Sequence, residues 1–114
     1  MSYSFFGTCF NDYQHLFKCL NTILNQTVIP KEIILVNSGD LNIEKAIIKM
    51  ISNKKIKLIY IEKKLSRVKS LNIALDKSTA KYSFRFDSRS RFSEDYSEKA
   101  LKILNDKLCD VAVV

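Results

Sequence analysis

The sequence has few of the side chains from which metal and redox sites are built. Its 114 residues include a single histidine, His15, and three cysteines, Cys9, Cys19 and Cys109. The cysteines lie far apart and form no C-x-x-C pair, which is typical of buried thiols that pack as small apolar side chains. His15 has no neighbouring ligand residues and is expected on a helix surface. A metal or redox role for these residues is therefore disfavoured.

Long apolar stretches are also lacking. No segment approaches the roughly 20 apolar residues that a membrane span needs, and the N-terminus has neither the charged start nor the apolar core of a secretory signal. We expect a cytoplasmic protein, with the inner face of the membrane as an alternative location. Internal repeats, linkers and low-complexity segments are absent, and the length suits one hydrophobic core but not two. Residues 1–114 are thus expected to form a single domain.

Charge does not decide between partners. The formal net charge of +7 raises the hypothesis of a basic nucleic-acid-binding domain. The lysines, however, are scattered among isoleucines and asparagines, without a recognition helix, an aromatic RNA-binding signature or zinc spacing. A basic surface for anionic small molecules or an anionic membrane explains the charge at least as well, and so does a coding bias towards Ile, Lys and Asn. We expect no nucleic-acid partner and keep that class as an alternative.

What the sequence does contain is a regular alternation of strand and helix patterns. The apolar run at 33–36 has no polar alternation, which is typical of a strand buried on both faces of a parallel sheet. Pro30 ends the preceding helix, and Asn11-Asp12, Asp40 and Ser93 are placed to cap helix starts. Strands are expected over residues 4–10, 32–36, 57–61, 82–86 and 110–114, and helices over 13–25, 40–53, 68–75 and from 93 onward.

This order predicts an α/β fold with a mainly parallel sheet and helices on both of its faces. The last strand pattern stops at the end of the sequence, so we expect the chain to be the first part of a longer domain, truncated after the fifth strand.

Three polar loops follow strands that the pattern makes neighbours, at residues 7–11, 37–40 and 87–91. In an open α/β sheet, ligands bind at the carboxyl ends of the strands. Phe10 can cover a base or sugar, and Arg89 and Arg91 can hold phosphate oxygens. No G-x-G-x-x-G and no G-x-x-x-x-G-K-S/T motif is present, so dehydrogenase-type dinucleotide binding and the P-loop NTPases are disfavoured. The aromatic, polar and arginine side chains of these three loops therefore favour a nucleotide site that uses neither of these two motifs.

The motifs resemble family 2 glycosyltransferases with the GT-A fold, in their nucleotide-sugar-binding part. The resemblance rests on CLNTILNQT at 19–27, EIILV at 32–36 and the NSGD turn at 37–40, followed by LNIA at 71–74 and YSFRFDSR at 82–89. These pieces occur in the order and spacing of the family and cover nearly the whole chain. Residues 85–96 are most similar to bacterial polysaccharide-building members.

The resemblance implies a set of nucleotide-sugar contacts. Thr8 and Phe10 match a pair that packs on and hydrogen-bonds the nucleotide, and Arg67 or Lys69 matches a basic residue that approaches it. Asn37 and Ser38 stand where the family places two acids, so neutral groups would have to make those contacts. The expected contacts are Thr8, Phe10, Asn11, Asn37, Ser38, Gly39, Arg67, Lys69, Asp87, Ser88 and Arg89.

The implied metal is Mn²⁺ or Mg²⁺, held by a D-x-D motif of which Asp87 matches the first acid. Arg89 replaces the second acid, which removes an oxygen ligand and adds a repelling charge. Our hypothesis is that Arg89, together with Arg91, partly replaces the metal beside the diphosphate.

The resemblance further implies transfer of a sugar to a glycan or lipid-linked acceptor in polysaccharide or surface-glycan assembly. In this family the acceptor site and the carboxylate base lie beyond the part present here, so we expect the chain alone to be inactive or very weak. A non-catalytic nucleotide-binding domain stays open, because three expected acids are missing. Individually, Thr8, Asn37, Ser38 and Asp40 also fit a purely structural role at strand ends and helix starts.

Overall fold

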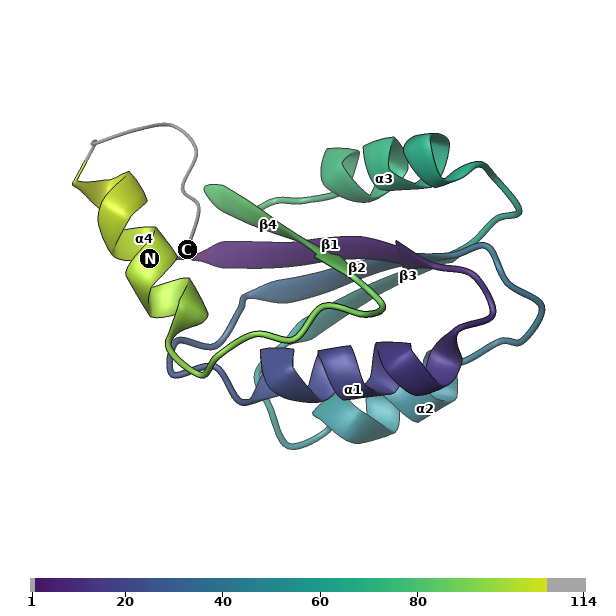
Figure 1. The fold of residues 1–114 in the computed structure, drawn as a ribbon, viewed down its shortest axis with the longest axis horizontal. Helices are drawn as coiled ribbons and strands as arrows, with labels where there is room; N and C mark the ends of the chain where they lie inside the picture. The colour runs from purple at the N-terminus through teal and green to yellow at the C-terminus, as the bar shows by residue number, and fades with distance from the viewer. Residues whose placement is uncertain (1, 107–114) are drawn as a thin grey trace.

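A computed structural model describes residues 2–106 of the chain. Strands and helices alternate along this part of the sequence (Figure 1). The elements are β1 (Tyr3–Cys9), α1 (Tyr13–Leu24), β2 (Glu32–Asn37), α2 (Glu44–Ile51), β3 (Lys57–Glu62), α3 (Arg67–Asp76), β4 (Tyr82–Asp87) and α4 (Tyr96–Asn105). The predicted α/β class is confirmed. The fifth strand expected at 110–114 lies outside the described residues.

The four strands form one parallel sheet in the order β3-β2-β1-β4. The chain therefore winds outward from β1 to β3 and then crosses back to place β4 on the other side of β1. This reversal makes the boundary between β1 and β4 the topological switch point, where the loops on either side diverge and leave room for a ligand. Thr8 is paired with Asp87 at the carboxyl end of this boundary.

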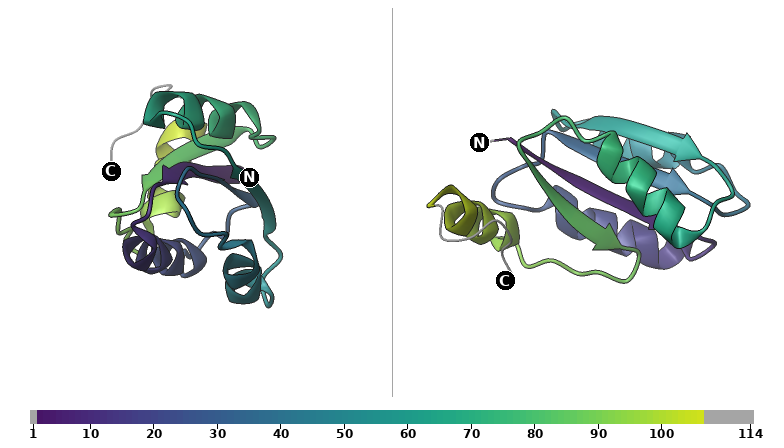
Figure 2. Two further views of the ribbon diagram at one scale, coloured as in Figure 1. Left: turned by 90° about the vertical axis from the view of Figure 1, so that its right-hand side faces the viewer. Right: turned by 90° about the horizontal axis from the view of Figure 1, so that it is seen from above.

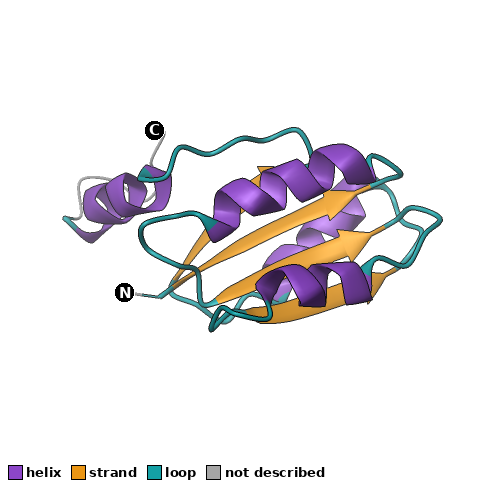
Figure 3. Ribbon diagram, turned by 90° about the horizontal axis from the view of Figure 1, so that it is seen from below, coloured by secondary structure: helices purple, strands orange, loops and turns teal. Residues whose placement is uncertain are grey.

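Helices cover both faces of the sheet, as the views in Figures 2 and 3 show. Helices α1 and α2 pack on one face, over the large cluster that includes Phe5, Leu35 and Phe86. Helix α3 covers the other face of β1 and β2, over a smaller cluster that includes Phe6, Ile34 and Val36. Every residue of β2 is buried, which confirms that the apolar run belongs to a strand covered on both sides.

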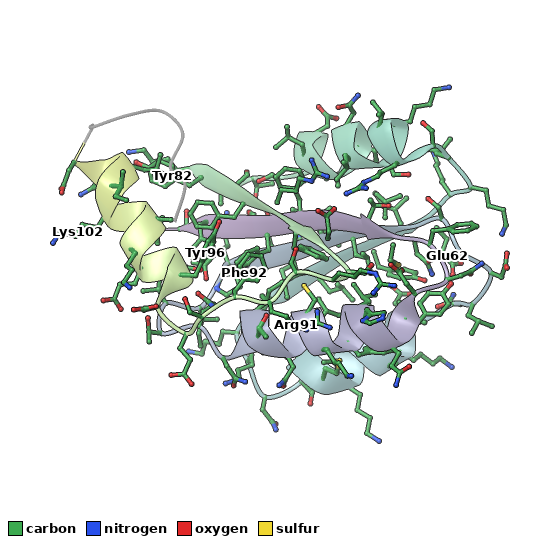
Figure 4. All side chains as sticks on the ribbon, in the orientation of Figure 1. Glu62, Tyr82, Arg91, Phe92, Tyr96 and Lys102 are labelled. Carbon is green, nitrogen blue, oxygen red and sulfur yellow. The ribbon has the colours of Figure 1, made fainter. Side chains whose placement is uncertain are left out.

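Helix α4 lies beyond the amino ends of the strands, away from the switch point (Figure 1). Gln26 ties it to the end of α1, because its amide donates to the Ser93 carbonyl (2.7 Å) and accepts from the Ser97 backbone N–H (2.9 Å). Phe92 and Tyr96 pack in a tilted arrangement, with 4.7 Å between ring centroids, and extend the aromatic core formed by Phe5 (Figure 4).

The helix starts differ from the sequence prediction. Helix α2 begins at Glu44 rather than near Asp40, since the Asn42 side chain accepts from the Glu44 backbone N–H (2.9 Å) while Asp40 pairs with Lys64. The fourth helix begins at Tyr96, after a turn in which Ser93 donates to the Asp95 carboxylate (3.1 Å). Asp12 stands at the start of α1 but makes no side-chain capping bond to the helix.

Two of the three thiols expected to be buried lie in the described residues, and both are buried, while Cys109 lies outside them. Cys9 and Cys19 are free and buried, and burial raises the pKa of each thiol to about 12. They are therefore packed apolar groups rather than nucleophiles at neutral pH. Within residues 2–106, no helix is long and apolar enough to cross a membrane.

Candidate functional site

A pocket of about 650 Å³ opens at the carboxyl edge of the sheet, across the switch point. It is built from the residues that follow β1, β2 and β4 and from the segment before α3. Seven of the residues expected at a nucleotide site line it: Thr8, Phe10, Ser38, Arg67, Asp87, Ser88 and Arg89. The pocket also includes Cys9, Asp12 and Leu65. From the sequence, Cys9 was expected only as a buried thiol and Asp12 only as a helix cap, and no signal pointed to Leu65.

Close contact between β1 and β4 requires a glycine at position 7. A Cβ atom on Gly7 would lie 2.5 Å from the Phe86 carbonyl oxygen and 2.8 Å from the Phe86 ring. Without a side chain at Gly7, the Phe86 ring can pack directly on the β1 backbone and the two strands keep their register. This register sets Thr8 opposite Asp87 on the wall of the pocket.

Asn37 is buried behind the pocket and does not line it. Its amide donates to the Leu41 carbonyl (2.7 Å) and the Tyr60 hydroxyl (2.9 Å), and its carbonyl accepts from the Gly39 backbone N–H (2.9 Å). Its side chain is 1% exposed. The side-chain amide of Asn37 therefore makes its hydrogen bonds within the protein, where they stabilise the turn after β2.

Asn11 joins the first loop to the second. It has a φ of 58°, a left-handed conformation that asparagine tolerates better than most residues. Its side chain accepts from the Asp40 backbone N–H (2.8 Å) and donates to the Asp40 carboxylate (3.0 Å). Gly39 lies directly beneath, where a Cβ would collide with Asn11 and Tyr13. Asn11 and Gly39 thus hold the loops that carry Phe10 and Ser38, without lining the pocket themselves.

A pair of serine hydroxyls closes the inner wall. Ser38 Oγ lies 3.1 Å from Ser70 Oγ of α3, and the two residues are 6% and 0% exposed. One hydroxyl donates to the other, and Ser38 is the member of the pair that lines the pocket. Phe10, by contrast, is 66% exposed at the rim. The pocket therefore combines a polar inner wall with an exposed aromatic ring.

The third loop places a carboxylate among arginines. Arg67 Nη2 lies 2.6 Å and Arg85 Nη2 3.3 Å from the same oxygen, Asp87 Oδ1. Arg91 instead donates to the carbonyl oxygens of Ser88 (3.1 Å) and Ser90 (2.7 Å). Arg67 and Arg85 are therefore the partners of Asp87, and Arg91 is engaged by the backbone of its own turn.

Lys69 is exposed on α3 and lies outside the pocket lining. The Ser66 side chain, which caps α3, accepts from the Lys69 backbone N–H (3.3 Å). Arg67, at the start of the same helix, is the basic residue of this segment that reaches the pocket.

The described residues offer few protein ligands for a divalent cation. Mn²⁺ and Mg²⁺ prefer several oxygen ligands, yet residues 2–106 contain no group of three His, Cys, Asp or Glu side chains placed to hold a metal. Oδ1 of Asp87 already accepts from two guanidinium groups. The charge beside Asp87 is therefore supplied by arginine.

Sequence comparison places the chain among sugar-transferring proteins. The family model described as Glycosyl transferase family 2 matches residues 4–114. The chain is 30% identical over 105 residues to Glycosyltransferase GlyA of Streptococcus pneumoniae, covering 91% of the chain and 15% of that protein. It is 31% identical over 97 residues to an uncharacterized glycosyltransferase of Haemophilus influenzae, covering 83% of the chain and 30% of the relative. The chain thus spans less than a third of either relative.

Solved structures share the fold. Residues 1–349 of S. aureus TarS in complex with UDP-GlcNAc match with a TM-score of 0.76 and 19% identity, over 93% of this chain and 32% of that one. The mannosyltransferase PcManGT from Pyrobaculum calidifontis, in complex with GDP-Man and Mn²⁺, matches with a TM-score of 0.73 and 19% identity, over 90% and 32%. The fold is therefore that of the GT-A glycosyltransferases, as the sequence motifs implied.

Proposed function

Because the chain belongs to glycosyltransferase family 2, we propose that its pocket binds a nucleotide-diphosphate sugar. We propose further that the chain is the donor-binding part of a longer transferase. That protein would pass the sugar to a glycan or lipid-linked acceptor during assembly of bacterial polysaccharide or surface glycan. A lipid-linked acceptor would bring the protein to the inner face of the membrane, where a net charge of +7 favours anionic lipid.

The observation that carries the proposal is the composition of the pocket at the switch point. An exposed aromatic ring, Phe10, stands at the rim, and the hydroxyl of Ser38 lies on the inner wall. Arg67 and Arg89 line the remaining side. A nucleotide-diphosphate sugar has a flat base, polar edges and an anionic diphosphate. The aromatic ring suits the base, the hydroxyl suits the polar edges and the arginines suit the diphosphate.

Calorimetric titration with UDP, GDP, UDP-GlcNAc and GDP-mannose tests donor binding. We expect saturable binding of at least one of these ligands by the chain. Phe10→Ala should weaken that binding about fivefold or more, because stacking of a base on an aromatic ring contributes about 1–3 kcal/mol. Ile48→Ala is the matched control, since it shortens an exposed apolar side chain on α2, outside the pocket. If none of the four ligands binds, the proposal is wrong.

Catalytic incompleteness is a separate part of the proposal. It is supported by the share of the relatives that the chain spans, 15% and 30%, and no described residue is assigned the role of the base. We expect the isolated chain to release no sugar from donors that it binds, as measured by nucleotide release. Turnover by the chain alone would contradict this part and leave donor binding standing.

A non-catalytic nucleotide-binding domain is the second candidate. It is favoured by Asn37, Ser38 and Arg89, which stand where the resemblance places acids. Binding of UDP or GDP without any transfer by the longer protein, in the presence of its donor sugars and membrane fractions, would support this candidate over a transferase.

A further inference from the structure

All four arginines of the sequence gather around Asp87, whereas the fifteen lysines are spread over the rest of the chain. Arg67 and Arg85 bind the Asp87 carboxylate directly, and Arg89 and Arg91 belong to the turn that follows it. Arginine presents a planar fork of donors that matches phosphate oxygens, while lysine presents a compact, strongly hydrated point charge. The clustering of the arginines near Asp87 therefore favours binding of an anion at this place.

The turn after β4 directs one of these arginines to the pocket. The Ser90 backbone N–H donates to the Asp87 carbonyl (2.9 Å), and the Ser90 hydroxyl accepts from the Asp87 backbone N–H (3.0 Å). Arg91 closes the same turn through the carbonyl oxygens of Ser88 and Ser90. Arg89 lies within this braced turn, lines the pocket and makes no ion pair with another residue in the range 2–106.

Arg67 reaches the pocket from a different element, helix α3. It is the first residue of α3, and its Nη2 atom lies 2.6 Å from Asp87 Oδ1. One such bond occupies a single donor of a guanidinium that carries five. The remaining donors of Arg67 stay available to a second acceptor, and the carboxylate restricts the side chain to this position.

The balance of charge favours an anionic ligand over a metal ion. The pocket and its immediate partners include Arg67, Arg85 and Arg89, against the carboxylates of Asp12 and Asp87. A divalent cation beside Asp87 would meet the guanidinium groups of Arg67 and Arg85 and an oxygen that already accepts from both of them. A diphosphate in the same place would meet net positive charge and unused N–H donors.

We propose that Arg67, from the start of α3, and Arg89, from the turn after β4, together clamp the diphosphate, so that donor binding needs no divalent cation. This inference rests on the proposed function. Asp87 is then a positioning residue that holds Arg67, rather than a metal ligand. Arg67 takes the place that the sequence hypothesis gave to Arg91, because Arg91 is engaged by the backbone of the turn.

Titration of UDP and GDP into the chain, in EDTA and separately in Mn²⁺, tests the clamp. We expect the same dissociation constant in both buffers. Arg67→Ala and Arg89→Ala should each weaken binding in EDTA about tenfold to a hundredfold, the usual effect of losing a hydrogen bond to a charged group. The loss should be larger for UDP than for UMP or uridine, since only the diphosphate reaches both arginines.

Two further variants separate the clamp from general effects. Lys102→Ala removes the same charge from α4, at the far end of the molecule (Figure 4), and should leave affinity unchanged. Arg67→Lys keeps the charge but loses the planar fork, so it should bind with intermediate affinity. Comparable thermal midpoints for all variants would show that the fold is kept.

The possible results separate a failure of the arginine clamp from a failure of donor binding itself. If UDP or GDP binds with Mn²⁺ and not in EDTA, the clamp is wrong while donor binding survives. If either alanine variant binds UDP in EDTA as well as the wild type does, the clamp is also wrong. If neither nucleotide binds in any buffer, the clamp and the proposed function fall together.

Discussion

Replacing Asn37 by aspartate restores the acid that the family resemblance implies, yet we expect it to destabilise this protein. The Asn37 amide donates two hydrogen bonds, to the Leu41 carbonyl (2.7 Å) and the Tyr60 hydroxyl (2.9 Å), from a position that is 1% exposed. A carboxylate cannot donate either bond. The Tyr60 hydroxyl cannot readily compensate, because it already donates to Glu62 (2.9 Å).

The magnitude follows from these contacts. Two lost hydrogen bonds cost about 1 kcal/mol each, and a buried charge facing a carbonyl oxygen adds about 1–3 kcal/mol. The sum of about 3–5 kcal/mol is a large share of the roughly 5–15 kcal/mol that stabilises a typical domain. In acid the introduced carboxyl becomes neutral and can donate to the Leu41 carbonyl. The difference in the free energy of unfolding between Asn37→Asp and the wild type should therefore become smaller as pH falls.

Urea denaturation of the wild type and Asn37→Asp, at neutral pH and in mild acid, measures this effect. Asn53→Asp is the matched control, because it makes the same change at an exposed position and should alter stability little. If Asn37→Asp loses less than about 1 kcal/mol at neutral pH, or no more than the control, then Asn37 does not brace the turn as described.

Two other substitutions and one labelling experiment test the structure further. Gly7→Ala should lower stability by about 1–3 kcal/mol, because the added methyl must push against the Phe86 backbone. Thermal denaturation should record a fall of about 4–8 °C per kcal/mol, and an unchanged midpoint would contradict the close approach. Burial raises the pKa of Glu32, but hydrogen bonds from its neighbours outweigh burial and leave the pKa lowered. Its contribution is therefore present above the ordinary glutamate range and lost as pH falls through the folded pKa, so Glu32→Gln should show a shallower loss of stability in acid. Iodoacetamide at pH 8 should label Cys9 and Cys19 only after unfolding, because burial raises the pKa of both thiols to about 12. Rapid labelling of either peptide in the native protein, detected by mass spectrometry, would refute their burial.

Much of the fold was predictable because local patterns and long-range packing agree. The apolar run at 33–36 cannot be satisfied on an exposed strand, and in the structure every residue of β2 is buried. Helix starts were less predictable, because several polar residues near each boundary compete for the same role. Asp40 does not cap α2, since it is engaged by Lys64 and Asn11 across the loop, and Asn42 instead accepts from the Glu44 backbone N–H just before the helix.

The sequence by itself determined the alternating elements, the parallel sheet and the loops from which the pocket is built. Periodicity and turn residues act over a few positions and set the elements, and the lack of polar alternation at 33–36 already requires a strand covered on both faces. Only the tertiary structure decided which side chains meet. It turned Asn37 inward, placed Arg67 on Asp87 and tied Arg91 to the backbone. These pairings join residues from different elements or depend on burial, and a linear pattern carries no information about which of several arginines reaches one carboxylate.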